Sequence, residues 1–335
     1  MLTEISLTSF RNFENQIFTF EKGLNLIIGP NGSGKTNILE AIGYISQAKS
    51  FRRAADKDII TWGKEFFRIE AKLEKDGTKH NISISYELET ASKKILVNNK
   101  PVEKTSILFS LFPSLISTDR DQDIIDGYPV ERRNMINRLI SIANPEYMNL
   151  MLDYRKVIEN KNVLLREQKT KELKPWNQKQ DDLSSRIVSY RREFIERMRE
   201  PFGILSKEFL NNKKADIYFS PSLDGSRSLD ELIKEELEAG FSIYGPHRDS
   251  IDFLIDERPA KIFGSEGEKR LIILAFYFTF LDIYKPESMV ILDEPFSVLD
   301  RRGTGIVLSH LLNQTFISAP FIYEGIQKFE KVLNL

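Results

Sequence analysis

Hydrophobic and polar positions follow strand-like patterns over the first hundred residues, with one helical interruption. Residues 2–8 and 17–28 alternate or run apolar, and residues 66–99 alternate with a period of two, which predicts strands. The polar turns EKDGTK and VNNK divide the last of these segments into an antiparallel meander. Apolar positions recur at helical spacing in KTNILEAIGYIS, residues 35–46, so this segment is predicted to be a helix.

The middle of the chain is predicted to be helical, and its end returns to mixed structure. From about residue 129 to 214 the sequence has long charged amphipathic stretches, and PWNQ near residue 175 is expected to break them into a helical hairpin. Residues 215–262 are mixed, an apolar helix is predicted after Gly267, and the run MVIL at 289–292 predicts a strand. The pattern indicates an α/β core that a helical insertion interrupts.

Composition excludes several classes of protein. The 335 residues are 41% hydrophobic, enough for one large domain with an insertion or for two domains. The absence of cysteine excludes disulfides, thiol nucleophiles and cysteine-bound metals. The start MLTEISLTSF lacks the features of a secretory signal, and the apolar run at residues 271–281 is shorter than the ~18 residues that span a bilayer. A soluble cytoplasmic protein with no membrane partner is therefore expected.

Charge is unevenly distributed along the chain. The net charge is −1, but residues 151–215 carry 16 Lys and Arg against 10 Asp and Glu, so this segment is +6 and the remainder is −7. A basic segment on an otherwise acidic protein is typical of a nucleic-acid interface. A solvated helical arm of mixed charge has the same composition, and both interpretations stay open.

The sequence GPNGSGKT, residues 29–36, matches the phosphate-binding loop G-x-x-x-x-G-K-[ST]. A predicted strand precedes it and a predicted helix follows it, which favours a P-loop over an ordinary glycine-rich turn. Glycines let backbone N–H groups turn toward phosphate oxygens, and the helix N-terminus adds partial positive charge. Lys35 is expected to reach the β- and γ-phosphates, and Thr36 to ligate Mg²⁺. A nucleoside triphosphate is the predicted ligand.

An acidic motif lies more than 250 residues further along the chain. MVILDEPFSVLD, residues 289–300, is an apolar strand that ends in Asp293 and Glu294. Asp293 is expected to hold Mg²⁺ through water or Thr36, and Glu294 to orient and deprotonate the attacking water. A strand end with exposed acids is the alternative, which the presence of a P-loop disfavours. Because both motifs must meet at one phosphate, a large insertion is expected between them.

A third segment, FGSEGEKRLIILAF at residues 263–276, precedes that strand. Ser265 and Glu268 form the S-x-x-E pattern of a capping box. One interpretation is a well-capped core helix. The other is that the serine, the glycine and the free N–H groups bind a γ-phosphate, which would belong to a second subunit because the chain's own loop is already filled. The spacing does not decide between them.

In this order and at this spacing, GPNGSGKT, SEGEKR, ILDEP and SVLD resemble the ABC-type ATPases of the SMC group. Within that group the chain is similar to the RecF family across nearly its whole length. This closer resemblance also includes SLTSFRNF at 6–13 and KSFR at 49–52. GYPVERRNMINRLI at 127–140 and YGPHRDSIDF at 244–253 resemble segments specific to RecF, whereas the ATPase motifs are shared with many proteins.

The resemblance implies a fold and a division into domains. The fold would be α/β, with an ABC-type P-loop ATPase core, an antiparallel β-meander and an inserted helical lobe. Residues 1–120 and 241–335 would form the ATPase core, or lobe I, and residues 121–240 the helical insertion, or lobe II. The signature helix near 265–281 could belong to either lobe.

The resemblance also implies site residues. Contacts to the nucleotide are implied for Arg11, Asn12, Gly29, Pro30, Asn31, Gly32, Ser33, Gly34, Lys35, Thr36, Asn37, Gln122, Ser265, Gly267 and Asp300. Roles in catalysis are implied for Glu294, Lys35 and Ser318, and metal contacts for Thr36, Asp293 and Gln122. Arg11 and Asn12 would lie near the base and phosphates. The signature Ser265 and Gly267 would grip ATP across a dimer, at an interface to which the D-loop Asp300 would also belong.

Some positions depart from the family's pattern. The Q-loop residue is Asp121 or Gln122, because RDQDI differs from the usual run. Ser318 stands where threonine is usual in RecF, and Glu294 where many RecF proteins carry aspartate. The signature SEGEKR replaces a glutamine-rich form and adds negative charge near the phosphate.

The function implied by the resemblance is an ATP-gated DNA clamp that acts as a recombination mediator in DNA replication and repair. Mg-ATP would drive homodimerisation on duplex DNA and on ss/ds junctions or gaps, and slow hydrolysis would release the DNA. RecR- and RecO-type mediators would be partners in loading RecA. His247 and Arg248 would lie near the nucleotide or the DNA; a turn whose charged residues pair locally is the alternative.

Three other functions share the P-loop. A transporter ATPase subunit would need a membrane-domain partner and an LSGGQ signature, and an SMC-like ATPase with a nuclease domain would need a further acidic metal cluster. A small-molecule kinase would keep its acidic motif closer to the P-loop. The basic helical insertion, the FRNF start and the distant acidic motif favour the DNA clamp.

Overall fold

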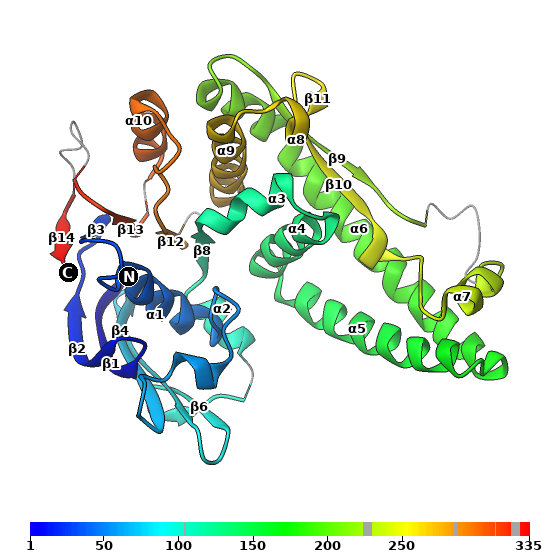
Figure 1. The fold of residues 1–335 in the computed structure, drawn as a ribbon, viewed down its shortest axis with the longest axis horizontal. Coiled ribbons are helices and arrows are strands. Elements are labelled where there is room, and N and C mark those ends of the chain that lie inside the picture. Colours follow the sequence, from blue (N-terminus) through cyan, green and yellow to red (C-terminus); the bar gives the residue numbers. More distant parts are fainter. Residues whose placement is uncertain (104, 224–229, 285–286, 312, 323–328) are drawn as a thin grey trace. The chain divides into compact units, whose positions relative to one another are not determined.

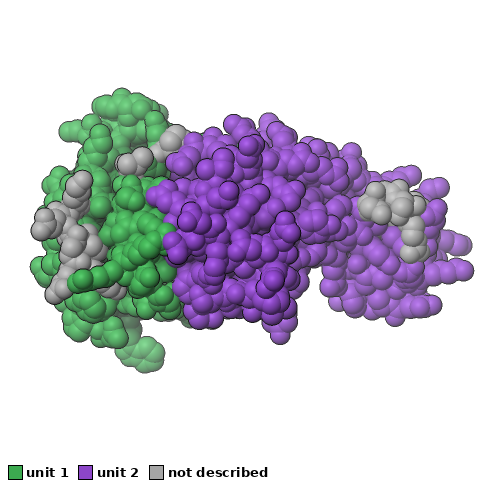
Figure 2. Space-filling model, turned by 90° about the horizontal axis from the view of Figure 1, so that it is seen from above, with its two compact units in different colours: residues 1–120, 284–335 green, residues 121–283 purple. Residues whose placement is uncertain are grey.

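The structure is a computed structural model that describes the chain except for residues 104, 224–229, 285–286, 312 and 323–328 (Figure 1). The contacts divide the chain into two compact units (Figure 2). Unit 1 contains residues 1–120 and 284–335, and unit 2 contains residues 121–283. Both units combine helices with strands, so the predicted α/β class is confirmed.

Unit 1 contains an antiparallel sheet with the strand order β2-β1-β4-β5-β6-β7. Its strands are β1 (Leu2–Phe10), β2 (Phe13–Thr19), β4 (Phe66–Lys75), β5 (Thr78–Glu87), β6 (Ser92–Val97) and β7 (Lys100–Pro101). In β4 every second side chain from Phe67 to Leu73 is buried, as expected of a sheet with one face on the core. The predicted meander over residues 66–99 is therefore confirmed.

A second sheet in unit 1 is parallel, with the strand order β14-β3-β13-β12-β8. Its strands are β3 (Leu24–Ile28), β8 (Ser114–Ser117), β12 (Met289–Leu292), β13 (Thr315–Ala319) and β14 (Lys331–Asn334). Every residue of β8, β12 and β13 is buried, because a parallel sheet is normally covered on both faces. The predicted strand at 289–292 is therefore confirmed as β12.

Helix α1 (Lys35–Gln47) lies between the two sheets of unit 1 (Figure 1). It contacts β1 and β4 of the antiparallel sheet and β8, β12 and β13 of the parallel sheet. One hydrophobic core joins all three layers and includes Leu7 of β1, Ile42 of α1 and Phe316 of β13. This position explains why α1 is buried on nearly all sides, and it confirms the helix predicted at 35–46.

Shorter elements complete unit 1. They are α2 (Ser106–Leu111), α10 (Arg301–Ser309) and the 3-10 helix η1 (Asp56–Ile59), while η2 (Asp119–Asp121) leads into unit 2. No helix in the described part of the chain combines the length and the apolar composition needed to cross a membrane.

The prediction of one strand over residues 17–28 is wrong. β2 ends at Thr19 and pairs antiparallel with β1, whereas β3 begins at Leu24 and pairs parallel with β13. Gly23 in the intervening turn has φ 103°, a left-handed conformation that glycine adopts without strain. Phe20 in the same turn is buried against Phe316, with ring centroids 5.0 Å apart. The apolar pattern therefore continues through a turn that belongs to the core.

Unit 2 is mostly helical and carries a small antiparallel sheet of order β11-β10-β9. Its strands are β9 (Ala215–Ser220), β10 (Ser250–Ile255) and β11 (Arg258–Pro259). Its helices are α3 (Gln122–Asp126), α4 (Pro129–Ala143), α5 (Pro145–Arg166), α6 (Thr170–Phe209), α7 (Ile233–Ala239), η3 (Pro246–Arg248), α8 (Ala260–Phe263) and α9 (Glu266–Tyr284). The apolar helix predicted after Gly267 is thus α9.

Helices α5 and α6 form a hairpin, but its turn is not where PWNQ predicted it. α6 continues through Pro175, and the chain turns at residues 167–169, where Gln168 has φ 57°. Pro175 lies near the start of α6, where a proline removes one backbone hydrogen bond without ending the helix. The buried face that begins with Leu173 keeps this part of α6 packed.

Helix α9 packs in the core of unit 2. The ring of Phe276 makes edge-to-face contacts with Phe202 of α6, at 5.1 Å between centroids, and with Phe253 of β10, at 5.4 Å. β10 in turn pairs with β9 along its whole length. By their contacts, residues 241–283 belong to unit 2. This range includes the signature helix, which the resemblance left in either lobe.

Candidate nucleotide-binding site

The predicted phosphate-binding loop connects β3 to α1 in unit 1. Gly34 precedes the first residue of α1 with φ 106°, and a Cβ atom there would lie 2.7 Å from Asn12 Nδ2. The backbone angle favours glycine at this position, and a Cβ would also force the side chain of Asn12 to move. Gly32 also has a positive φ, and Ser33 N–H donates to Pro30 O at 3.2 Å. The loop is therefore tightly turned at the helix start, as the motif requires.

Lys35 is held inside this loop. Its side chain is 5% exposed, and Nζ donates hydrogen bonds to Gly29 O at 2.9 Å and to Pro30 O at 3.2 Å. The carboxylate Oε1 of Glu294 lies 3.6 Å from the same nitrogen. The cation of the P-loop and the acid predicted as the base are thus neighbours in unit 1.

Asp293 joins the P-loop to two strands of the parallel sheet. Its Oδ1 accepts hydrogen bonds from Thr36 Oγ1 at 3.0 Å and from Ser318 Oγ at 2.6 Å. Burial raises the pKa of Asp293, and the two hydroxyl donors oppose that shift. Residues from α1, β13 and the end of β12 therefore converge on one carboxylate, although more than 250 positions separate Thr36 from Asp293.

Glu294 follows Asp293 in a left-handed backbone conformation, with φ 46°. This conformation is uncommon for a residue with a side chain. Its N–H donates to Ser318 Oγ at 2.8 Å, and its side chain is 41% exposed. The backbone is thus held from β13 while the carboxylate is accessible to solvent.

A buried acid that belongs to none of the sequence motifs binds the guanidinium of Arg11. Glu40 of α1 is completely buried and accepts hydrogen bonds from Arg11 Nε at 2.8 Å and Nη2 at 2.7 Å. A second arginine is close to the same carboxylate: Arg52 Nη1 lies 3.7 Å from Glu40 Oε2. Arg52 belongs to KSFR, one of the segments that carry the family resemblance. Nothing in the local sequence pattern distinguishes Glu40 from other acids on a helix.

Asn12 and Asn37 link this arginine cluster to the P-loop. Asn12 Nδ2 donates to Ser33 O at 3.3 Å, and Asn37 Nδ2 donates to Asn12 Oδ1 at 2.8 Å. Arg52 Nη1 in turn donates to Asn37 Oδ1 at 3.1 Å. The structure therefore brings the predicted FRNF residues and the P-loop together on one side of α1.

These side chains line a pocket of about 640 Å³ in unit 1. Its lining residues are Arg11, Asn12, Asn31, Gly32, Gly34, Lys35, Thr36, Asn37, Arg52, Asp58, Ile60 and Glu294. The volume lies within the range of small-molecule and cofactor sites in proteins. The combination of cations, backbone N–H groups and an apolar residue suits a nucleotide with its phosphates.

The signature residues lie in unit 2, where they form a capping box. Ser265 N–H donates to Glu268 Oε2 at 2.8 Å, and Glu268 N–H donates to Ser265 Oγ at 3.3 Å. Lys213 Nζ also contacts Glu268, at 2.6 Å. Burial raises the pKa of Glu268, but the donors Lys213 and Ser265 outweigh it and hold the pKa below its usual range. The capping-box prediction is confirmed, and Gly267 lies in the first turn of α9.

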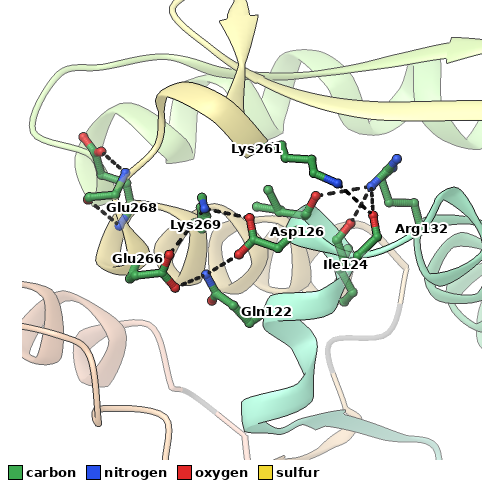
Figure 3. A network of polar contacts seen from close by, with 11 residues as sticks. Gln122, Ile124, Asp126, Arg132, Lys261, Glu266, Glu268 and Lys269 are labelled. Carbon is green, nitrogen blue, oxygen red and sulfur yellow. Dashed lines mark hydrogen bonds and ion pairs between the residues drawn. The ribbon is translucent and has the colours of Figure 1, made fainter.

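The two candidates for the Q-loop residue have different surroundings in unit 2. Gln122 begins α3 and donates from Nε2 to Glu266 and Asp126 (Figure 3). Asp121 is buried beside the hydroxyl of Tyr277, whose pKa is raised by burial. Gln122 is therefore the candidate that contacts the signature segment.

Three other predicted positions have structural partners. Asp300 caps the N-terminus of α10, since its Oδ1 accepts from Gly303 N–H at 2.7 Å. His247 is partly buried, with Nδ1 2.7 Å from Tyr154 Oη and Nε2 3.0 Å from Ser242 O, and its partial burial lowers its pKa. Arg248 lies over the ring of Phe241.

The strand, loop and helix around Lys35, with the acids of β12 beside Thr36, define the ABC-type class of P-loop proteins. The chain belongs to the RecF family, and the broader RecF/RecN/SMC N terminal domain family matches residues 1–328. It is 30% identical to the DNA replication and repair protein RecF of Natranaerobius thermophilus over 353 residues, covering 95% of this chain and 90% of that protein. It is also 30% identical to RecF of Carboxydothermus hydrogenoformans over 332 residues, covering 94% and 93% of the two chains.

Solved structures show the same fold. A structure of the recombination mediator protein RecF-ATPrS in the RecFOR pathway has a TM-score of 0.89 and 25% identity, covering 100% of this chain and 96% of that chain. A RecF-ATP structure has a TM-score of 0.85 and 26% identity, covering 99% and 95%. An SmcHead bound to the C-winged helix domain of ScpA shares the fold alone, with a TM-score of 0.63 and 17% identity over 99% and 93% of the chains.

Proposed function

We propose that the chain is an ATP-dependent switch that binds DNA during replication and repair. The observation that carries this proposal is the convergence of Thr36 and Ser318 on Asp293 beside the P-loop lysine. The two solved RecF complexes with ATPrS and ATP support ATP as the ligand. The names of the RecF relatives support a role in DNA replication and repair.

ATP is the proposed ligand of the pocket in unit 1. Lys35 would hold the β- and γ-phosphates, and the N–H groups of the P-loop would contact their oxygens. Arg11 and Asn12 would contact the nucleotide near its base and phosphates. Glu294, whose carboxylate is partly exposed beside Lys35, would orient the attacking water and accept its proton.

Mg²⁺ fits the donor set of this pocket. Thr36 Oγ1 and the carboxylate of Asp293 lie 3.0 Å apart, and oxygen donors of this kind are what Mg²⁺ prefers. When bound with ATP, the ion would neutralise charge on the phosphates. Gln122 is proposed as a further metal contact, from the Q-loop position in unit 2.

The proposed output of ATP binding is a homodimer. Ser265 and Gly267 would contact the γ-phosphate of the nucleotide held by a second copy, with Asp300 at the same interface. Hydrolysis would then separate the two copies. Slow turnover is proposed because the rate of hydrolysis would set how long the dimer stays on DNA. Ser318 would affect this rate through its contacts with the acids at the end of β12.

The proposed nucleic-acid ligand is duplex DNA with a single-stranded gap or junction. Basic side chains would contact phosphates, so affinity would fall with salt. RecR- and RecO-type mediators are the proposed partners, with RecA loading as the outcome; the RecFOR pathway named for the solved relatives supports this assignment.

The test of the ATPase assignment is hydrolysis measured without any acceptor substrate, with and without gapped DNA. Release of phosphate from ATP that stops in Lys35→Ala supports the proposal. Phosphate release that needs a small-molecule acceptor would support a kinase instead.

A further inference from the structure

Four side chains form a closed ring between α3 and the first turn of α9 (Figure 3). Gln122 Nε2 donates to Glu266 Oε2 at 2.8 Å and to Asp126 Oδ2 at 3.2 Å. Lys269 Nζ donates to Asp126 Oδ1 at 2.6 Å and to Glu266 Oε1 at 3.4 Å. Each carboxylate therefore receives one contact from the amide and one from the ammonium group.

The ring rests on an anchored helix. α3 has only five residues, and its last carbonyl groups need partners outside the helix. The buried guanidinium of Arg132 supplies them: Nη1 donates to Ile124 O at 3.2 Å and to Ile125 O at 3.3 Å. Arg132 also lies 3.4 Å from Asp252 of β10. Arg132 thus fixes the backbone of α3, while residues of α9 fix the side chains of Gln122 and Asp126.

The ring carries one positive and two negative charges. The side chain of Lys269 is 9% exposed, that of Asp126 is 32% exposed and that of Glu266 is 65% exposed. Burial would lower the pKa of Lys269, but its bonds to Asp126 and Glu266 outweigh burial and raise it. Lys269 is therefore positively charged at neutral pH, and it offsets part of the negative charge that Glu266 brings to the signature turn.

Two N–H groups in that turn have no protein acceptor in the described part of the chain. The capping box uses the N–H groups of Ser265 and Glu268. Glu266 and Gly267 follow at the positions where a helix leaves its N–H groups unpaired. An acidic side chain in the first turn is attracted to such groups by the partial charge of the helix end. The carboxylate of Glu266 is nonetheless directed to Gln122 and Lys269.

We propose that Lys269, which Asp126 holds in place, is a positioning residue that acts together with Gln122 to keep the carboxylate of Glu266 away from the open N–H groups of the signature turn. This inference rests on the proposed function, in which that turn contacts a phosphate of the second copy's nucleotide. A free Glu266 carboxylate would compete for the same N–H groups and repel the phosphate. The ring therefore makes an acidic signature compatible with an anionic ligand.

The test is ATP-dependent dimerisation of the full chain, measured by light scattering in a Glu294→Gln background with Mg-ATP. Lys269→Ala removes the ammonium contact and the positive charge beside Glu266, so that only the neutral amide of Gln122 holds this carboxylate. Lys269→Ala combined with Glu266→Gln opens the ring but removes the charge. Glu266→Gln alone is an exposed, near-isosteric change that keeps the fold, and Lys179→Ala on the exposed face of α6 is the control for loss of one lysine. Circular dichroism and ATP binding by the monomer check the folding of each variant.

We expect Lys269→Ala to weaken the dimer at least tenfold and the double variant to dimerise within threefold of the parent. Glu266→Gln should dimerise as tightly as the parent or more tightly, and Lys179→Ala should match the parent. A Lys269→Ala variant that dimerises normally, or a double variant as weak as Lys269→Ala, would overturn the inference while leaving the proposed function intact. A parent chain that binds ATP but does not dimerise would overturn both.

Discussion

Ser318 Oγ donates a 2.6 Å hydrogen bond to Asp293 Oδ1, and the same hydroxyl accepts the backbone N–H of Glu294. One buried hydroxyl from β13 thus holds two acids at the end of β12. It also stabilises the left-handed backbone of Glu294. This arrangement gives Ser318 a positioning role that does not require it to touch a phosphate.

Ser318→Ala should slow ATP hydrolysis while leaving ATP bound. Losing the hydroxyl leaves the N–H of Glu294 and an oxygen of Asp293 without this partner, which costs about 1–3 kcal/mol. If that loss falls on the transition state, the rate falls about 5- to 150-fold. Steady-state phosphate release should show a lower kcat with a nearly constant KM. Ser318→Thr keeps the hydroxyl and should restore most of the rate. An alanine variant with normal kcat would remove Ser318 from the mechanism.

Glu294→Gln should retain nucleotide and DNA binding but lose hydrolysis. A positioned general base contributes about 10²–10⁴-fold, and glutamine cannot accept the proton. Single-turnover hydrolysis of bound ATP measures this step directly. Glu287→Gln, an exposed acid on the segment before β12, is the matched control. Normal turnover in Glu294→Gln would mean that another group acts as the base.

Lys35→Ala should greatly weaken ATP binding. The ammonium group is buried in the P-loop, where it would donate charge-assisted hydrogen bonds to the phosphates. Each such bond is worth about 1.5–3 kcal/mol, so its loss should lower affinity by about tenfold or more. Titration of a fluorescent ATP analogue measures the change. Lys22→Ala on the exposed turn before β3 should bind normally. Unchanged affinity in Lys35→Ala would contradict the assignment of the pocket.

Unit 2 contains a buried ion pair whose disruption should be costly. Lys161 Nζ lies 2.5 Å from Glu236 Oε2, and both side chains are 0% exposed. Lys161→Met leaves the carboxylate buried and unpaired, which costs about 3–5 kcal/mol of unfolding free energy. Lys161→Met with Glu236→Leu should recover part of that loss, because no charge is left unpaired but Ser242 and Ile243 lose their carboxylate acceptor. Urea unfolding measures both, and a cost below about 1 kcal/mol for the single variant would show that the pair is not structurally important.

Part of the nucleotide site could be predicted from the sequence because its motifs are local. The P-loop needs a strand, a glycine turn and a helix in succession, so residues 29–36 can be recognised from the sequence alone. The acids after β12 were recognisable for the same reason. Glu40 was not, because only the three-dimensional contact with Arg11 distinguishes it from other acids on a helix.

Long-range contacts explain the remaining differences between sequence and structure. The turn at Gly23 was missed because Phe20 is buried within it, so the apolar pattern did not stop. Pro175 predicts a break in the hairpin, but packing keeps α6 continuous there. Gln122 and Glu266, which the ring joins, are 144 positions apart. The sequence around neither residue indicates this contact.

The central claim is that ATP joins two copies of this chain on DNA. Light scattering of Glu294→Gln, with and without Mg-ATP and then with gapped duplex DNA, tests it most directly. The account predicts a monomer without nucleotide, a dimer with Mg-ATP, and a dimer–DNA complex whose affinity falls steeply with salt. A protein that stays monomeric when saturated with Mg-ATP, and does not shift onto DNA at low salt, would contradict it.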